Sequence, residues 1–485
     1  MNINKVNESM LVDFYEFTMT NGYFVSGLAD KKVVFDMFFR KVPDNGSFAI
    51  MAGLEQVIEY IENLHFADED IEYLSSRGIF SEDFLGYLKD FEFTCDIDAV
   101  PEGTPIFPQE PIVRVKGPLI QAQFIETMLL MHINHQSLIA TKARRLVKAA
   151  KGRNVVEFGS RRAQGSSGAL LGARAAYIGG CSGTACTLAD QLFKVPALGT
   201  MAHSWVQLFT KEEEAFRRYC EIYPENAILL VDTYDVLNSG IPNAIKVFNE
   251  ILIPKGFRPK GVRIDSGDMA YLSRQARVML DEAGFNDCII FASNSLDEVV
   301  INDLINNQNA QIDSFGVGEC LITSKSDPVF GGVYKLSAVD EKGEMIPKIK
   351  LSENVEKITN PGYKNVWRLY DKKTNKAIAD VLTLADEFID TSKPYHLFDP
   401  DHTWKQKLIA DFTARQLLEP VFDKGKCVYK RKSLAEIRDY CKEELNSFWE
   451  EILRLERPQP YFVDLSLSLW KMRKNLITEH IFTEK

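Results

Sequence analysis

The chain has 485 residues, of which 45% are hydrophobic and 26% are charged, a balance typical of a globular protein with several domains. Its formal net charge of −11 argues against a general nucleic-acid binder or a protein of anionic membrane surfaces. No apolar run is long enough to span a bilayer, and the N-terminal residues lack the apolar core of a signal peptide. The eight cysteines form no Cys-x-x-Cys pair, so we expect reduced thiols, a cytoplasmic location and no structural metal site.

The first part of the chain predicts an α+β domain over residues 1–140. Residues 32–40 read as a strand, and prolines divide residues 91–117 into short segments typical of a small β layer. Apolar periodicity predicts helices over residues 10–28, 54–64, 121–132 and 142–151. The last of these begins a basic stretch, since residues 142–162 contain eight basic residues and only one acid, Glu157.

The middle of the chain predicts a parallel sheet. Short apolar runs recur, most of them about 25 to 35 residues apart, with helical patterns between them, as in βαβ units. They cover residues 154–158, 196–199, 227–231, 261–264, 287–292 and 314–317. This repetition favours a (β/α) barrel-like domain over residues 141–332 rather than an open sheet, although only six strands are evident.

The alternation of strands and helices ends in the last part of the chain. Residues 333–337, 346–351 and 366–370 read as strands joined by polar turns, and we expect strands from 333–390 to complete the N-terminal β layer. The β-rich segment is predicted to end near residue 394. Residues 395–485 are predicted to be mainly helical because residues 434–455 show an amphipathic helical pattern.

Polar residues or glycines follow each predicted strand of the middle domain. The carboxyl ends of parallel strands lie at one edge, so one face should gather Arg161, Arg162, His203, Asp232, Asp265, Asp268 and Asn294. Asp232, Asp265 and Ser293 also stand where helix caps belong. Capping explains six such strand ends poorly, and we therefore predict a functional site at this edge.

The residue types at this edge suit a phosphate and a sugar. Adjacent guanidinium groups can bind phosphate oxygens in pairs. Aspartates can hold ribose hydroxyls directly or through hydrated Mg²⁺, and the amides of Gly316 and Gly318 can approach a phosphate closely. Residues 319–332 form a loop that could close over this phosphate. The sequence contains neither a Walker A motif nor a Gly-x-Gly-x-x-Gly motif before a helix.

Six motifs in this chain closely resemble those of the nicotinate phosphoribosyltransferases, a type II phosphoribosyltransferase family. They are DFYEFTM at residues 13–19, EFGSRRAQG at 157–165, GTMAHS at 199–204, LVDTY at 230–234, GVRIDSGD at 261–268 and FGVG at 315–318. The motifs keep the family's order and span roughly residues 10–370. The C-terminal hundred residues add little to the resemblance.

The resemblance implies a reaction. Nicotinate and 5-phosphoribosyl 1-pyrophosphate would give nicotinate mononucleotide and pyrophosphate, the first step of NAD biosynthesis from nicotinate. ATP hydrolysis would be coupled to this transfer through a phosphohistidine at His203, as in an ATP-dependent ligase, with Mg²⁺ bound to pyrophosphate and Asp265 as the candidate ligand of the ion. Asp232 and Asp265 would lie near His203 and the ribose and complete the catalytic set.

The resemblance also assigns substrate contacts. Phe158 would stack on the pyridine ring, with Tyr15 of a partner subunit on the other face, which implies a homodimer. Arg263 and Thr200 would lie near nicotinate, and Gly318 near the 5-phosphate. The other predicted substrate-binding residues are Arg161, Arg162, Ser204, Asp268, Asn294 and Gly316.

The identity of the pyridine substrate rests on charge. Nicotinamide enzymes related to this family carry an aspartate in the segment that corresponds to residues 179–188, and this chain has no acid there. An acid would repel a carboxylate, so nicotinate is favoured over nicotinamide. Quinolinate, with two carboxylates, would need more basic residues. A non-catalytic phosphosugar sensor would have no use for His203, and a barrel aldolase would need a lysine at a strand end, which is absent.

Overall fold

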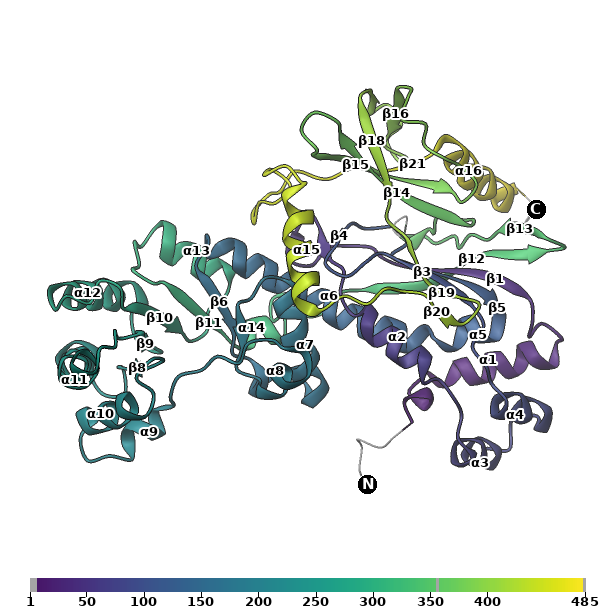
Figure 1. Ribbon diagram of the computed structural model, residues 1–485. Helices are drawn as coiled ribbons and strands as arrows, with labels where there is room; N and C mark the ends of the chain where they lie inside the picture. The colour runs from purple at the N-terminus through teal and green to yellow at the C-terminus, as the bar shows by residue number, and fades with distance from the viewer. Residues whose placement is uncertain (1–6, 355–356, 483–485) are drawn as a thin grey trace. The chain divides into compact units, whose positions relative to one another are not determined.

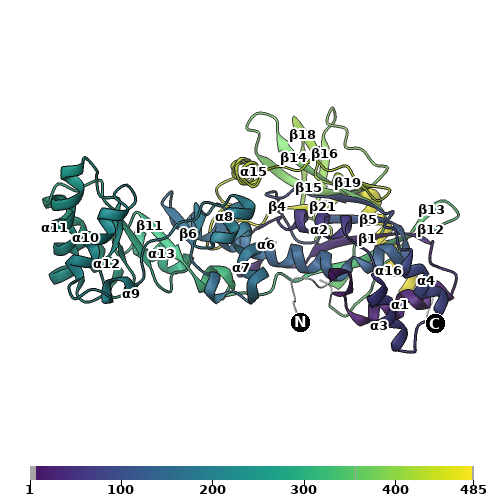
Figure 2. The same ribbon diagram turned by 60° about the horizontal axis from the view of Figure 1, so that its bottom comes forward.

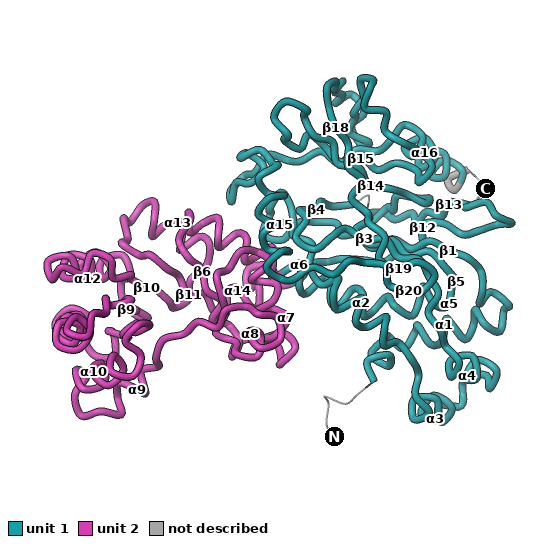
Figure 3. The backbone as a smooth tube through the Cα atoms, in the orientation of Figure 1, with its two compact units in different colours: residues 1–138, 329–485 teal, residues 139–328 magenta. Residues whose placement is uncertain are grey.

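The computed structural model describes residues 7–354 and 357–482. The chain forms two compact units, residues 1–138 with 329–485 and residues 139–328 (Figure 3). Helix α6, Glu126–Ala149, contributes to both units. No helix among the residues described is long and apolar enough to cross a membrane.

The first unit is built on an antiparallel sheet of seven strands (Figure 1). In sheet order these are β13 Glu344–Pro347, β12 Gly332–Glu341, β1 Lys32–Phe39, β5 Val113–Pro118, β3 Asp96–Ala99, β19 Glu419–Asp423 and β20 Lys426–Cys427. The chain re-enters this unit through β12, which pairs with β1 from Val33↔Val339 to Phe39↔Gly332. The expected return of residues 333–337 to the N-terminal β layer is therefore confirmed.

A second sheet of the first unit corrects the prediction for the C-terminal part. Its order is β18 Phe412–Gln416, β14 Lys364–Asp371, β15 Ala377–Leu384 and β21 Val463–Leu465. Residues 366–370 thus pair with β15 and β18, not with the N-terminal layer. The prediction that residues 395–485 are mainly helical is wrong, because the described part of this region also holds six strands. These strands are short, and several pair with strands distant in sequence, so local periodicity gives a weak signal for them.

Short elements and helices complete the first unit. The two-stranded pairs are β2 Ala49–Ile50 with β4 Pro105–Ile106, and β16 Tyr395–Phe398 with β17 Gln406–Ile409. The helices are α1 Phe14–Val25, α2 Leu54–Glu62, α3 Asp68–Ser76, α4 Glu82–Lys89, α5 Leu119–Phe124, α15 Leu434–Asn446 and α16 Leu467–Phe482. The short 3₁₀ turns are η2 Glu8–Met10 and η3 Pro43–Asn45. The predicted basic helix over 142–151 is the continuation of α6, which is one uninterrupted helix.

The second unit is a parallel α/β layer, as the strand spacing predicts. Its sheet order is β7 Gly183–Thr184, β6 Asn154–Glu157, β11 Ser314–Val317, β10 Ile289–Ser293, β9 Gly261–Ile264 and β8 Ile228–Leu230, with all pairs parallel. Parallel strands covered on both faces read as continuous apolar runs, which is why the sequence revealed them. No ladder joins β7 to β8 in the part of the chain described, so barrel closure is not confirmed.

Helices alternate with these strands: Figure 1 shows α10, α11 and α12 beside β8 and β9, and Figure 2 shows these three helices grouped at one end of the unit. The helices are α7 Gly165–Ile178, α8 Thr187–Phe193, α9 His203–Gln207, α10 Glu212–Ile222, α11 Ile241–Val247, α12 Met269–Glu282, α13 Glu298–Asn306 and α14 Glu319–Ile322. The shorter turns are η4 Ser160–Arg162, η5 Val236–Gly240, η6 Phe248–Leu252 and η7 Ile253–Lys255. Strand residues such as Val262 and Ile290 pack on Phe216, Phe248 and other fully buried helix residues.

Two local predictions in this unit are wrong. Residues 196–199 form no strand: Ala197 makes only an isolated bridge to Thr184, since Pro196 has no N–H to donate. The sequence pattern also predicts a single helix from Trp205 to Phe216, but this helix is broken, because Lys211 is extended and α10 starts anew after it. Three glutamates in the first turn of α10 favour this new start.

Candidate active site

The candidate site lies at the carboxyl edge of the parallel sheet. Phe158 follows β6, Asp232 follows β8, and Asp265 follows β9. His203 begins α9 after the segment that bridges to β7. The fold thus brings together side chains from residues 158 to 318, as expected for the ends of parallel strands.

His203 lies among two carboxylates and a hydroxyl group. Its Nε2 atom is 3.9 Å from Asp232 Oδ1 and 3.8 Å from Asp265 Oδ2. Its Nδ1 atom is 3.1 Å from Thr233 Oγ1. The His203 side chain keeps 40% of its surface exposed, whereas that of Asp232 keeps only 1%. The imidazole ring is therefore accessible to a reactant, while the acid behind it is held inside the protein.

The two aspartates are fixed by different partners. Asp232 Oδ2 accepts from the backbone N–H of Asp265 at 3.0 Å and from Ser266 Oγ at 2.6 Å. Asp232 Oδ1 is buried without a hydrogen-bond donor. Asp265 Oδ1 accepts from Arg263 Nη2 at 2.9 Å and from the hydroxyl of Ser293. A buried carboxylate oxygen without a donor is costly, which indicates a position where a ligand or water supplies the missing partner.

Arg263 connects this acidic group to the Phe158 ring. Its Nε donates to Ser293 Oγ at 2.9 Å and its Nη1 to Thr200 Oγ1 at 3.0 Å. Its guanidinium carbon lies 5.5 Å from the centre of the Phe158 ring. Thr200 is held in turn by Tyr219, whose hydroxyl donates to the Thr200 carbonyl at 3.4 Å.

Phe158 forms an aromatic floor beside this arginine. Its ring stacks on Phe291 with centroids 5.4 Å apart and planes inclined by 23°. Gly316 leaves room for both rings, because a Cβ there would lie 2.7 Å from Phe158 and 2.8 Å from Phe291. An aromatic face next to a guanidinium suits a flat ring that carries a negative charge.

The adjacent arginines lie on the exposed turn η4 that follows Phe158. The turn is closed by the Arg162 backbone N–H, which donates to Gly159 O at 2.7 Å. Glu319, the acid that follows Gly318, is already paired with another cation, because its Oε1 atom lies 2.8 Å from Lys325 Nζ. The bond from Lys325 holds the pKa of Glu319 below its usual value, and Arg162 adds to the shift.

Three of the predicted residues lie at the exposed rim. Asp268 is the N-cap of α12 and accepts from the Tyr271 backbone N–H at 2.8 Å. Ser204 is exposed in the first turn of α9. Asn294 is exposed as well and has φ of 101°, which is rare for a residue with a side chain. Strained backbone of this kind clusters at functional sites.

Sequence reasoning missed three polar residues of the site, Thr233, Ser266 and Ser293, and one buried acid next to it, Glu157. The first two stand next to predicted aspartates within the motifs, which was the available signal. Ser293 was interpreted only as a candidate cap, yet α13 is capped by Asp297, and the Ser293 hydroxyl bonds Arg263 and Asp265 instead. Glu157 was noted only as an acid in a basic stretch and is fully buried.

Tyr15 belongs to the first unit, on α1. It is 42% exposed. Burial and the charge of Glu126 raise the pKa of Tyr15. The predicted contact of Tyr15 with a partner subunit stays a prediction.

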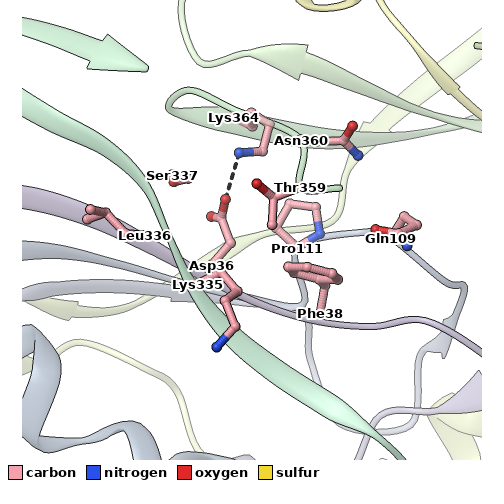
Figure 4. Close-up of a pocket in the computed structure, with 10 residues that line it drawn as sticks. All are labelled: Asp36, Phe38, Gln109, Pro111, Lys335, Leu336, Ser337, Thr359, Asn360 and Lys364. Carbon is pink, nitrogen blue, oxygen red and sulfur yellow. Dashed lines mark hydrogen bonds and ion pairs between the residues drawn. The ribbon is translucent and has the colours of Figure 1, made fainter. Parts of the chain in front are cut away.

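A separate small cavity lies in the first unit and contains no predicted site residue (Figure 4). Lys364 Nζ and Asp36 Oδ2 form an ion pair of 2.6 Å in its wall, and both side chains are buried. The cavity volume is about 10 Å³, room for one water molecule. The second oxygen of Asp36 and the Asn360 side-chain oxygen, both buried without donors, fit such a water.

Comparisons with known proteins agree with the motifs. Models of the nicotinate phosphoribosyltransferase N-terminal and C-terminal domains match residues 10–134 and 363–473. The chain is 43% identical to the nicotinate phosphoribosyltransferase of Bacillus subtilis over 471 residues, covering 97% of this chain and 95% of that protein. It is 30% identical to the human enzyme over 524 residues, covering 96% of each.

Solved structures give the same result. The crystal structure of human nicotinic acid phosphoribosyltransferase superposes with a TM-score of 0.83 at 28% identity, covering 96% of this chain and all of that one. A nicotinate-nucleotide pyrophosphorylase from Pyrococcus furiosus shares the fold, with a TM-score of 0.70 at 23% identity over 92% of this chain and 97% of that one. Near-complete coverage at this identity, together with the His203 motif and the arginine–aspartate network, leads to one conclusion. The chain belongs to the nicotinate phosphoribosyltransferase family.

Proposed function

We propose that this chain forms nicotinate mononucleotide and pyrophosphate from nicotinate and 5-phosphoribosyl 1-pyrophosphate, with ATP hydrolysis coupled through a phosphohistidine at His203. The observation that carries the proposal is the accessible His203 ring beside Asp232 and Asp265. Family membership supports the transfer, and the histidine geometry supports the coupling.

In the phosphorylation step, an unprotonated ring nitrogen of His203 attacks the γ-phosphorus of ATP. The N–P bond forms as the bond from phosphorus to the bridging oxygen breaks, and ADP leaves with that electron pair. Asp232 and Asp265 stabilise a positive charge that develops on the ring, since both carboxylates lie within 4 Å of Nε2. Water later takes the phosphoryl group, releasing inorganic phosphate and regenerating the histidine.

In the transfer step, the pyridine nitrogen of nicotinate bonds to ribose C1 while the C1–oxygen bond to pyrophosphate breaks. Phe158 provides the face for the ring, and Arg263 with the η4 arginines attracts its carboxylate. Asp265 is the acid best placed for the ribose, since it is fixed by Arg263 and Ser293 at the same edge. Pyrophosphate leaves with the electron pair of the broken C1–oxygen bond, and arginines stabilise the negative charge that develops on it.

Mg²⁺ fits the residues present as a hydrated ion. The described residues hold no group of three or more His, Cys, Asp or Glu side chains arranged for a metal. Mg²⁺ commonly uses only one or two carboxylates and keeps its waters. Suitable ligand atoms are Asp232 Oδ1, which has no hydrogen-bond partner, and Asp265 Oδ2. When bound, the ion would neutralise phosphate charge.

The primary test is mass spectrometry after incubation with Mg-ATP, under conditions that preserve acid-labile phosphate, together with turnover assays for nicotinate, nicotinamide and quinolinate. His203→Ala is the test variant. His402→Ala is a matched control, since His402 is half-exposed and its Nδ1 also lies near a carboxylate, 3.1 Å from Asp399 Oδ2. We expect phosphate on wild type and on the control, and none on His203→Ala.

The outcomes separate the parts of the proposal. Phosphate that is discharged by 5-phosphoribosyl 1-pyrophosphate plus nicotinate supports the full mechanism. Nicotinate turnover without phosphorylation removes the coupling but keeps the transferase. If neither occurs and His203→Ala still binds 5-phosphoribosyl 1-pyrophosphate normally, the chain is a sensor, not an enzyme.

The proposed homodimer has its own test. If Tyr15 acts in the partner's site, Tyr15→Ala and His203→Ala subunits complement each other, because one site of each mixed dimer receives both wild-type side chains. Random reassociation of equal amounts makes half the dimers mixed, so about a quarter of wild-type activity returns. No recovery from a mixture shown to exchange subunits would contradict the shared site.

A further inference from the structure

Glu157 is a buried carboxyl group that the proposed reaction does not use. It is the last residue of β6 and has no exposed surface. Both of its oxygens have donors, because Oε2 accepts from Thr184 Oγ1 at 2.5 Å and Oε1 accepts from the Gly159 backbone N–H. Burial raises the pKa of this carboxyl group. A side chain so costly to bury is expected to have a structural or functional reason.

Thr184 extends this contact to the neighbouring strand. It is the last residue of β7, fully buried, and its Oγ1 also accepts from the Cys186 backbone N–H at 2.9 Å. The Ala185 N–H donates to the Glu157 carbonyl at 2.8 Å. The Glu157–Thr184 pair therefore fixes the segment after β7 against the end of β6.

On its other side the pair fixes the turn that carries the arginines. Gly159 donates to Glu157 and is the N-cap of η4. It cannot move outward easily, since a Cβ at Gly159 would already lie 2.6 Å from Ile322 Cβ and 2.8 Å from Gly318 O. Phe158 between them donates from its backbone to Val317 O at 2.8 Å. The position of the Phe158 ring thus depends on Glu157 and on close packing against β11.

We propose that Glu157 and Thr184 are positioning residues for the pyridine substrate. Their hydrogen bond sets the spacing between two parts of the site. One is Phe158 with the following turn η4, and the other is residues 185–186, which follow β7 and belong to the acid-free segment 179–188. This inference rests on the proposed function, because it takes Phe158 as the face of the pyridine site. The hydrogen bonds of the pair involve none of the groups around His203, so the pair should affect the ring and leave histidine phosphorylation unchanged.

The test compares Thr184→Val with Thr184→Ser. Valine keeps the volume but removes the hydroxyl, leaving Glu157 Oε2 and the Cys186 N–H without partners, whereas serine keeps both bonds. Leaving a buried polar group unpaired corresponds to about 10-fold in an equilibrium constant. We expect Thr184→Val to raise KM for nicotinate about 10-fold. It should leave KM for 5-phosphoribosyl 1-pyrophosphate, kcat and the rate of His203 phosphorylation within about 2-fold, and Thr184→Ser should restore KM.

A second measurement does not require activity. Hydrogen exchange of the Gly159 and Cys186 amides, the two donors held by the pair, should be about 10-fold faster in Thr184→Val than in wild type. Unchanged exchange at both amides would overturn the inference, whether or not wild type turns over nicotinate. A wild-type protein that turns over no nicotinate would by itself defeat only the proposed function. With active wild type, faster exchange without a change in KM would show a purely structural pair. Should Thr184→Val fail to fold, Glu157→Gln, which removes one acceptor at constant shape, must raise KM for nicotinate in its place.

Discussion

Gly316→Ala tests whether the Phe158 ring defines the nicotinate site. Gly316 lies on β11 directly beneath two stacked rings, and its missing side chain is the reason that they fit. The added Cβ would lie 2.7 Å from Phe158 Cδ2 and 2.8 Å from Phe291 Cε1. Carbon atoms prefer at least 3.5 Å, so the methyl group must push a ring away by about 0.8 Å.

This displacement predicts a specific loss. Misplacement by about 1 Å can cost about 100-fold in rate, so we expect kcat/KM for nicotinate to fall by about 10- to 100-fold. Overpacking of the sheet costs a further 1–3 kcal/mol or so in unfolding free energy. Phosphorylation of His203 by ATP should continue, because the histidine is held by Thr233, Asp232 and Asp265, whereas the ring packs on Phe291 and lies beside Arg263.

Gly261→Ala is the matched control for overpacking. Gly261 is the first residue of β9, at the end of that strand away from the site, and a Cβ there would lie 2.6 Å from Ile289 Cγ1. Thermal unfolding and steady-state kinetics should show both variants destabilised and only Gly316→Ala impaired toward nicotinate. Equal kinetic losses in both would refute the reasoning, since overpacking alone would then explain them. A Gly316→Ala enzyme with unchanged kcat/KM would refute the placement of the ring.

Three other predictions concern stability and the rim. Burial raises the pKa of Glu16 to about 8, above its unfolded value, so the contribution of this group to the free energy of unfolding is fully present below about pH 4.5 and is lost as pH rises toward 8. Urea unfolding should therefore show wild type losing stability relative to Glu16→Gln between pH 5 and pH 8. A difference between the two proteins that stays constant with pH would contradict this prediction. Arg368→Met should lower the free energy of unfolding by about 3–5 kcal/mol in the same assay, because it leaves the buried carboxylate of Asp380 without the guanidinium that lies 2.6 Å away in wild type. A loss below about 1 kcal/mol would argue against an ionised pair. Asp268→Ala should lower the free energy of unfolding by about 1 kcal/mol and Asp268→Ser should not, since serine also caps helices. If Asp268 binds substrate as well, Asp268→Ser must still reduce kcat/KM for 5-phosphoribosyl 1-pyrophosphate.

The distinction between caps and site residues was not predictable from the sequence. Asp232, Asp265 and Ser293 follow strands and occupy positions where caps are common. In the structure the caps are Asp235, Asp268 and Asp297, each three or four residues later. The side chains at the strand ends are therefore available to His203 and Arg263. Which of two nearby acids caps a helix depends on where that helix begins, and propensities define this boundary only to within a few residues.

The sequence by itself determined the parallel α/β unit, the strand ends that make its edge, and the motifs that place His203 with Asp232 and Asp265. Buried parallel strands read as apolar runs, and a polar residue after each run marks its end, so both signals are local. The mixture of helices and strands in residues 395–485 has no such local signal in the sequence, because β18 and β21 pair with β14 and β15, which lie far away in sequence.

Only the tertiary structure decided which side chains meet. It brought Ser293 between Arg263 and Asp265, joined Thr184 to Glu157 across 27 residues, and placed Gly316 under the Phe158 ring. These contacts join separate strands, and their distances are set by strand register and packing, which a one-dimensional pattern does not contain. The sequence thus predicted the candidate site residues, and the packed sheet decided how they are held.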